Sequence, residues 1–215
     1  MTETLVIDVW SDVVCPYCYL GRRQLAEAID EFEHRDEVAL RQRAFELDPH
    51  AALAHDRPLA ELVAAKYAIP VSQVHAMHER LESQARALGM TWSFATAKPT
   101  NTLDAHRVIA LASTQGLGDE ASDRLFRAYF SEGELVSDHE RLSALAGDVG
   151  VSDVALLWES DTFTDVVRAD ETAAEELAIT GVPCFLVDSK FMVVGAQGSA
   201  HILDVLRRAW ARRAT

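Results

Sequence analysis

At residues 11–21 the chain reads Ser11-Asp12-Val13-Val14-Cys15-Pro16-Tyr17-Cys18-Tyr19-Leu20-Gly21. The apolar and β-branched residues 5–10 before this segment predict a buried strand. Apolar residues then recur at the spacing of one helical face, at Leu20, Leu25, Ala28, Ile29 and Phe32. Pro16 stands where a helix tolerates proline best, at its first position. The pattern therefore places a Cys-x-x-Cys pair where a strand ends and a helix begins.

The spacing of Cys15 and Cys18 is typical of dithiol chemistry. A helix N-terminus carries unpaired backbone N–H groups and a partial positive charge, which favour a thiolate. We therefore expect Cys15 to be the exposed, attacking sulfur. Cys18, one helical turn further on, would resolve a mixed disulfide by intramolecular attack. Pro16 removes an N–H group that has no partner there, and Tyr17 offers no imidazole to hydrogen-bond the sulfur.

Two roles without redox chemistry stay open for the cysteine pair. A closed zinc site needs two further ligands at suitable spacing, whereas the third cysteine, Cys184, lies far along the chain and no histidine is near. Alternatively, both cysteines are unreactive core residues, because free cysteine packs as a small hydrophobe. His75 and His78 have no further ligand at metal-binding spacing, so we expect them on a solvated helix face.

Composition and charge exclude several classes of protein. Hydrophobic residues make up 49% and charged residues 25% of the 215 residues, as in globular domains. The net charge of −14 has the wrong sign for a nucleic-acid backbone, so we expect no nucleic-acid partner. No apolar run approaches the roughly 20 residues of a membrane-spanning helix. Because residues 1–9 also lack the features of a signal peptide, we expect a cytoplasmic protein that does not engage a membrane.

The middle of the chain predicts an all-helical block. A second strand is predicted over residues 38–47, and Asp48-Pro49 ends it. Helices are predicted at 59–69, 71–88, 103–115, 120–130, 139–149, 154–159 and 163–179. Residues 91–95 carry a short strand-like pattern, the one such pattern in this block.

The end of the chain returns to strands. Strands are predicted at 184–187 and 191–194 with a turn between them, and a helix capped by Ser199 follows over residues 200–213. Because the strands at the two ends must meet to close a sheet, we predict an α/β core formed by residues 1–57 and 180–215. Residues 58–179 are then a helical insertion into that core.

Gly181-Val182-Pro183 directly precedes the strand predicted at 184–187. Proline cannot donate a hydrogen bond to a β-ladder, so this residue either lies on a sheet edge or has a cis peptide bond. A cis bond would aim a backbone group at a neighbour. Together with the cysteine pair at a strand–helix junction, the sequence favours the cis form.

Further short motifs follow the cysteine segment in a fixed order. They are Phe45-Glu46-Leu47-Asp48-Pro49, Asn101-Thr102, Ala105-His106-Arg107, Phe126-Arg127-Ala128-Tyr129-Phe130 with Gly133, Gly181-Val182-Pro183 and Gly195-Ala196-Gln197. In these motifs the chain resembles the DsbA-like oxidoreductases of the thioredoxin superfamily that carry a helical insertion. The resemblance is closest to the cytoplasmic FrnE-like branch, and it spans most of the chain.

This resemblance implies a thioredoxin-like α/β fold with a large all-helical insertion, a redox-active Cys15/Cys18 pair and a cis bond between Val182 and Pro183. In that fold the proline loop faces the two sulfurs, so that the backbone of Val182 pairs with an extended substrate or holds a mixed disulfide, and Pro16 and Tyr17 help to position the substrate. The implied activity is thiol–disulfide exchange on protein or small-molecule disulfides, with no metal or organic cofactor. Glutathione or another low-molecular-weight thiol is a candidate co-substrate, and a homodimer is a candidate assembly.

Three further residues are candidates for the rim of the cleft. His106 matches a branch motif and either lines the cleft between insertion and core or is a structural histidine. Gln197 follows the last strand, where it lies either at the active-site rim or in an ordinary polar loop. Cys184 replaces the apolar residue that usually follows the cis proline. A small core residue is the favoured interpretation of Cys184, and a third redox thiol is the alternative.

A second function stays open beside the oxidoreductase. The 2-hydroxychromene-2-carboxylate isomerases and the kappa-class glutathione transferases resemble this chain and share the inserted fold. They usually carry serine in place of the first cysteine and use glutathione without disulfide exchange. The presence of both Cys15 and Cys18 favours redox chemistry.

Overall fold

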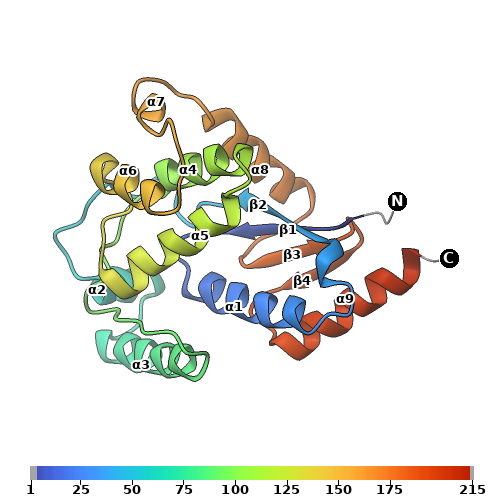
Figure 1. The fold of residues 1–215 in the computed structure, drawn as a ribbon. Helices are drawn as coiled ribbons and strands as arrows, with labels where there is room; N and C mark the ends of the chain where they lie inside the picture. The colour runs from blue at the N-terminus through green and yellow to red at the C-terminus, as the bar shows by residue number, and fades with distance from the viewer. Residues whose placement is uncertain (1–3, 214–215) are drawn as a thin grey trace.

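The computed structural model describes residues 4–213 as a four-stranded sheet with helices on both faces (Figure 1). The strands are β1 (Leu5–Ser11), β2 (Val38–Ala44), β3 (Cys184–Val187) and β4 (Phe191–Val194), in the spatial order β2-β1-β3-β4. β1 and β2 are parallel, as the crossover through α1 (Pro16–Asp30) requires. β3 pairs antiparallel with both β1 and β4.

The strands from the two ends of the chain are thus neighbours, as the sequence predicted. Trp10 is paired with Cys184, so the segment after β1 lies next to the loop before β3. This register brings the Cys-x-x-Cys segment and the Val182–Pro183 loop to the same end of the sheet.

Helices α2 to α8 all fall between β2 and β3. Their bounds are α2 (Leu59–Tyr67), α3 (Val71–Ala87), α4 (Leu103–Thr114), α5 (Gly118–Arg127), α6 (His139–Asp148), α7 (Ala155–Trp158) and α8 (Thr164–Glu176). A π-helical turn, η2 (Ala128–Glu132), extends α5. A 3-10 turn, η1 (Arg35–Glu37), precedes β2, and α9 (Ser199–Arg213) ends the described chain. Of the described helices, none is long and apolar enough to cross a bilayer.

Each face of the sheet has its own apolar core, because side chains alternate along a strand. Leu5, Ile7 and Val9 of β1 pack with α1 and α9. Trp10 points the other way and packs with Cys184 and with residues of α8 and the turn after it. A third and larger core lies inside the helical insertion.

Helix α1 belongs to two of these cores. Its first residues, including Cys18 and Leu20, are buried in the insertion core, whereas Leu25 and Ala28 are buried against the sheet. The helix therefore joins the insertion to the sheet.

A buried carboxylate fixes the centre of the sheet. Asp8 of β1 accepts charge-assisted hydrogen bonds from Arg41 and Arg43 of the neighbouring strand. Arg43 also donates to Asp170 of α8 at 2.7 Å, which attaches the insertion to the edge strand. Burial alone would raise the pKa of Asp8, but the two arginines outweigh it and hold that pKa below its usual range.

Two strand predictions were wrong. β2 ends at Ala44 instead of Leu47, because the N–H of Ala44 donates to the Asp170 carboxylate and the N–H of Leu47 to Asp12. Residues 91–95 form no strand. Their backbone N–H groups donate to other segments: that of Phe94 donates to the carboxylate of Glu82, and that of Ser93 donates to the carbonyl of Phe130.

The prediction that His75 and His78 of α3 both lie on a solvated helix face holds for His75 and is wrong for His78. His75 is exposed, but His78 is buried and its ring stacks on Phe94 with 4.1 Å between centroids. Burial, followed by the charge of His75, lowers the pKa of His78. Among residues 4–213 no three His, Cys, Asp or Glu side chains gather as a metal site requires.

Candidate active site

Cys15 occupies the N-cap position of α1. Its φ and ψ of −88° and 114° are extended, and Pro16 follows at the first helical position. The carbonyl of Cys15 accepts from the N–H of Cys18 at 3.1 Å, and the N–H of Cys15 donates to the carbonyl of Asp12 at 3.0 Å. The strand end, turn and helix start therefore hold the first sulfur at the helix N-terminus, as the sequence predicted.

The loop before β3 covers this sulfur. The Cys15 thiol donates to the carbonyl of Val182, with 3.6 Å between Sγ and the oxygen. The peptide bond between Val182 and Pro183 is cis, which confirms that expectation. Because the loop and the insertion cover it, the Cys15 side chain is only 4% exposed, less than the freely exposed sulfur that the sequence suggested. Tyr17 beside it is 47% exposed.

Close packing brings the proline loop onto α1. Gly21 lies one turn after Cys18, and a Cβ built there would be 2.8 Å from Cγ of Pro183. A glycine is therefore required where helix and loop touch. On its other side, the carbonyl of Pro183 accepts from the N–H of Gly195 at 2.7 Å, which ties the loop to the end of β4.

Cys18 is the more deeply buried sulfur, at 1% exposure. Burial raises its pKa well above the ordinary value, and its hydrogen bond with Cys15 and the charge of Cys15 raise it further. A hydrogen bond from the backbone of Asp12 opposes these effects. Cys18 therefore holds its proton at neutral pH while its sulfur stays within hydrogen-bonding reach of Cys15. All three cysteines are free thiols in the structure.

Cys184 is placed apart from this pair. Its side chain is fully buried with Trp10 and Ile179 on the α8 face of the sheet, whereas Cys15 and Cys18 lie in the insertion core. Burial raises the pKa of Cys184 to about 11. These surroundings are those of a small core residue.

His106 and Gln197 have different surroundings. Gln197 is exposed and donates to the carbonyl of Val194 at 2.9 Å, a local contact within the loop after β4. His106 of α4 is 3% exposed, and its Nε2 lies 3.6 Å from Oδ1 of Asp12, just before the cysteine segment. Asp12 is 1% exposed and was not among the predicted site residues. Its signal in the sequence is an acidic residue between a buried strand and the first cysteine.

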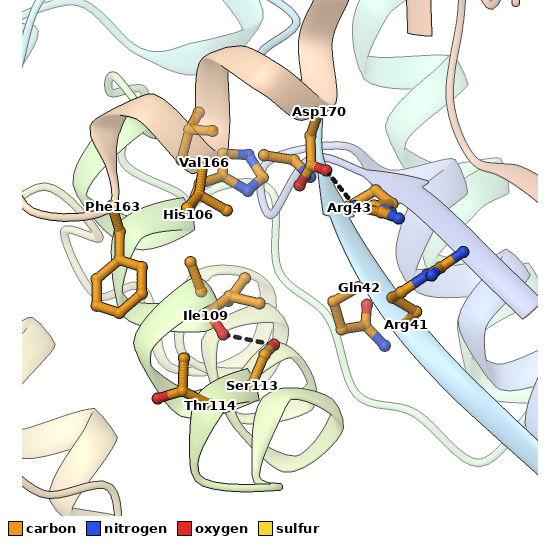
Figure 2. Close-up of a pocket in the computed structure, with 13 residues that line it drawn as sticks. Arg41, Gln42, Arg43, His106, Ile109, Ser113, Thr114, Phe163, Val166 and Asp170 are labelled. Carbon is orange, nitrogen blue, oxygen red and sulfur yellow. Dashed lines mark hydrogen bonds and ion pairs between the residues drawn. The ribbon is translucent and has the colours of Figure 1, made fainter. Parts of the chain in front are cut away.

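A pocket of about 370 Å³ lies between the edge strand β2 and helices α4 and α8, and His106 is one of its lining residues (Figure 2). Arg43 and Asp170 form an ion pair across its wall. Neither Cys15 nor Cys18 lines this pocket. His106 therefore both lines this pocket and lies near Asp12, which precedes the cysteine segment.

A dithiol at a helix N-terminus, facing a cis-proline loop on a sheet with an inserted helical block, defines a DsbA-like thioredoxin domain. The sequence matches the family of DSBA-like thioredoxin domains over residues 6–207, and the chain belongs to this family. It is 30% identical over 210 residues to the uncharacterized protein YwbO of Bacillus subtilis (strain 168), covering 96% of each chain. It is similar to the crystal structure of the probable DsbA oxidoreductase SCO1869 from Streptomyces coelicolor, with a TM-score of 0.91, 34% identity, and coverage of 96% of this chain and 90% of that one.

Two more distant structures share the fold. A 2-hydroxychromene-2-carboxylate isomerase gives a TM-score of 0.72 at 15% identity, covering 97% of this chain and 98% of that one. The cytosolic disulfide reductase DsbM from Pseudomonas aeruginosa, solved with GSH, gives 0.65 at 16% identity, covering 96% and 100%. The inserted thioredoxin fold therefore occurs in proteins of both function classes that the sequence left open.

Proposed function

We propose that this protein is a thiol–disulfide oxidoreductase whose redox centre is Cys15 and Cys18. The observation that carries the proposal is the placement of the two sulfurs. Cys15 lies at the N-terminus of α1 under the Val182 carbonyl, and Cys18 is buried one helical turn further on, where Cys15 helps to raise its pKa. An outer sulfur that meets the substrate and an inner sulfur that keeps its proton are what a two-step exchange needs.

The exchange proceeds through one mixed disulfide. The Cys15 thiolate attacks one sulfur of a substrate disulfide, and the other substrate sulfur leaves as a thiolate. Cys18 then loses its proton and attacks Cys15, which releases the second substrate thiolate and leaves the Cys15–Cys18 disulfide. The substrate gains two electrons and the enzyme loses two. The reverse sequence oxidises a dithiol substrate, and the reduction potential of the pair sets the direction.

The proline loop and the helix start position the substrate. The backbone of Val182 pairs with an extended substrate segment, Pro183 packs against α1, and Pro16 and the exposed Tyr17 form the opposite side of the entrance. Substrates are protein or small-molecule disulfides. We also propose glutathione or a similar thiol as co-substrate, since DsbM has been solved with GSH. A cytoplasmic location, a FrnE-like subgroup and a homodimer stay predictions.

The isomerase or transferase alternative differs from the oxidoreductase in whether Cys18 takes part in the reaction. Such an enzyme needs one nucleophile or one bound thiol, so a second thiol held next to the first has no part in its turnover. The contact between Cys15 and Cys18 favours the oxidoreductase.

Mass spectrometry with oxidised glutathione tests the proposal. We expect Cys18→Ser to accumulate a mixed disulfide of one glutathione on Cys15, and wild type to end as the internal disulfide. Cys15→Ser should form neither, and Cys184→Ser serves as the matched control that behaves as wild type. If wild-type thiols stay reduced in buffers poised from about −270 to −120 mV, the oxidoreductase assignment is wrong. Isomerase or transferase turnover that survives in Cys18→Ser would favour the alternative.

A further inference from the structure

A buried imidazole next to the cysteine segment has no hydrogen-bond partner at one nitrogen. Nε2 of His106 is buried and unpaired, and the nearest acidic atom is Oδ1 of Asp12 at 3.6 Å. This distance is longer than a hydrogen bond. A buried polar atom without a partner costs free energy, so its retention in the fold points to a role.

Asp12 connects this histidine to the resolving cysteine. One of its carboxylate oxygens accepts from the N–H of Leu47 at 2.7 Å, which fixes the side chain. Its backbone hydrogen-bonds to the thiol of Cys18, and the charge of its carboxylate contributes to the raised pKa of that thiol, after burial and Cys15. Asp12 therefore lies within electrostatic reach of the group that must lose a proton when the internal disulfide forms.

His106 also lines the pocket between β2, α4 and α8 (Figure 2). Arg41 and Thr114 at the lining of this pocket are exposed, so the pocket communicates with solvent. Cys18 itself is almost completely enclosed. Asp12, whose charge acts on the enclosed Cys18 thiol, thus lies 3.6 Å from an imidazole that lines a solvent-open pocket.

We propose that His106 accepts, by way of Asp12, the proton that Cys18 loses in the resolving step, and passes it to water in this pocket. The proposal rests on the proposed function and deepens it. In this step the S–H bond of Cys18 breaks as its sulfur bonds to Sγ of Cys15. The bond between Cys15 and the substrate sulfur breaks, and that sulfur leaves with the electron pair. The proton moves to Asp12 and then to Nε2 of His106, and in the reducing direction of the pair it returns by the same groups.

The charges around His106 suit a transient imidazolium. Asp12 lies 3.6 Å from its Nε2, and Glu46 is near enough for a charged His106 to act on its carboxylate. Burial raises the pKa of Glu46, while Arg168 and a charged His106 lower it. On the pocket side, Arg43 is already paired with Asp8 and Asp170. Arg168 of α8, which does not line the pocket, is paired with Glu46.

The remaining neighbours do not compete for the proton. On α4 itself, Asp104 and Arg107 pair with each other at 2.7 Å. Tyr129, which lies near enough for the charge of Asp12 to act on it, is buried, and burial raises its pKa far above neutrality. Its hydroxyl therefore stays protonated and cannot act as a base in the resolving step.

Stopped-flow reaction of the reduced protein with an aromatic disulfide that releases a coloured thiol separates the two steps. The first release reports attack by Cys15 and depends on reagent concentration. The second reports closure by Cys18 and does not. For His106→Phe and His106→Gln we expect the rate of the first release to stay unchanged. The rate of closure by Cys18 should fall about 100-fold at pH 7, which is the typical effect of removing a general base. His75→Phe, an exposed histidine on α3, is the matched control.

Two readouts distinguish proton transfer from a structural effect. If His106 accepts the proton, closure in the variants should depend more steeply on hydroxide concentration than closure in wild type, because hydroxide must then replace the imidazole as the base. Added imidazole should restore closure in His106→Ala, where the pocket can admit it, but not in His106→Phe, where the ring fills the space. Thermal unfolding of each variant verifies folding, and His106→Gln provides a near-isosteric replacement if the others unfold.

Closure at the wild-type rate and with the wild-type pH profile in folded His106→Phe or His106→Gln would overturn the proposal. Slow closure in His106→Ala that imidazole leaves unchanged would overturn it as well. Absence of both coloured releases in the wild-type protein would instead refute the proposed function, so the two failures are distinguishable.

Discussion

Replacement of Gly21 by alanine tests the contact between α1 and the proline loop. The added Cβ would lie 2.8 Å from Cγ of Pro183 and 3.2 Å from Cζ of Phe185. Carbon atoms pack best at about 3.5–4.0 Å. The proline ring is part of the backbone and the phenylalanine is fully buried, so neither can turn aside. Overpacking of this kind costs about 1–3 kcal/mol.

The chain supplies a matched control for this variant. Gly147 is an exposed residue of α6, and a Cβ built there meets nothing within 4 Å. Alanine in place of helical glycine gains up to about 1 kcal/mol of helix propensity at either position. The propensity gain cancels in the comparison, so Gly21→Ala should be less stable than Gly147→Ala by about 1–3 kcal/mol.

Thermal unfolding followed by circular dichroism measures this difference. One kcal/mol shifts the midpoint by roughly 2–4 °C in a chain of this size, so the two variants should differ by about 2–12 °C. We expect Gly147→Ala at or above the wild-type midpoint and Gly21→Ala below that of Gly147→Ala. Equal midpoints for the two variants would refute the close approach of α1 to the proline loop.

Three further predictions concern stability and thiol chemistry. Asp8→Asn should cost about 2–3 kcal/mol at pH 7 by urea unfolding, less than a fully buried pair because one arginine partner is half exposed. Because the pKa of Asp8 is lowered in the fold, this stabilisation is complete above the ordinary carboxyl pKa and is lost as the pH falls through the folded value, so wild type and variant should converge in acid. Ala68→Gly, at a residue with φ of 52°, should stabilise the protein by about 1 kcal/mol. Ala76→Gly, at an exposed position inside α3, should destabilise it by about as much, and the same sign for both would contradict the left-handed backbone at residue 68. Cys184, with a pKa of about 11, should resist iodoacetamide at pH 8 in the native protein and react only on unfolding, as peptide mapping would show.

Local patterns were sufficient to predict the fold and the position of the two sulfurs. The strand before Cys15, the helix after it and the proline at its first turn are all short-range features of residues 5–32. The helical block between the strands likewise followed from the periodicity of apolar residues and from its glycine and proline breaks. The cis bond before Pro183 was predicted from a proline at the start of a strand, taken together with the cysteine pair, and the core position of Cys184 from the packing of free cysteine as a small hydrophobe.

What the sequence missed depends on long-range contacts. The end of β2 is set by carboxylates of Asp12 and Asp170, which compete for its N–H groups from distant parts of the chain. The burial of His78 depends on stacking with Phe94, which no local pattern reveals. Asp12 and His106 are far apart in sequence, and their proximity appears only when α4 packs against β2.

The division of α1 between two cores has a consequence for local opening. Amide hydrogens exchange with solvent through cooperative units that usually coincide with packed motifs. The first turns of α1, with Cys18 and Leu20, are buried against the insertion, and its later turns are buried against the sheet. Because one helix packs in both cores, opening of the insertion core should also loosen the packing of α1 on the sheet. The amides of the insertion and of the sheet should therefore exchange as one unit. Under the proposed function, formation or reduction of a Cys15–Cys18 disulfide at the start of that helix would then change amide protection factors in both the insertion and the sheet.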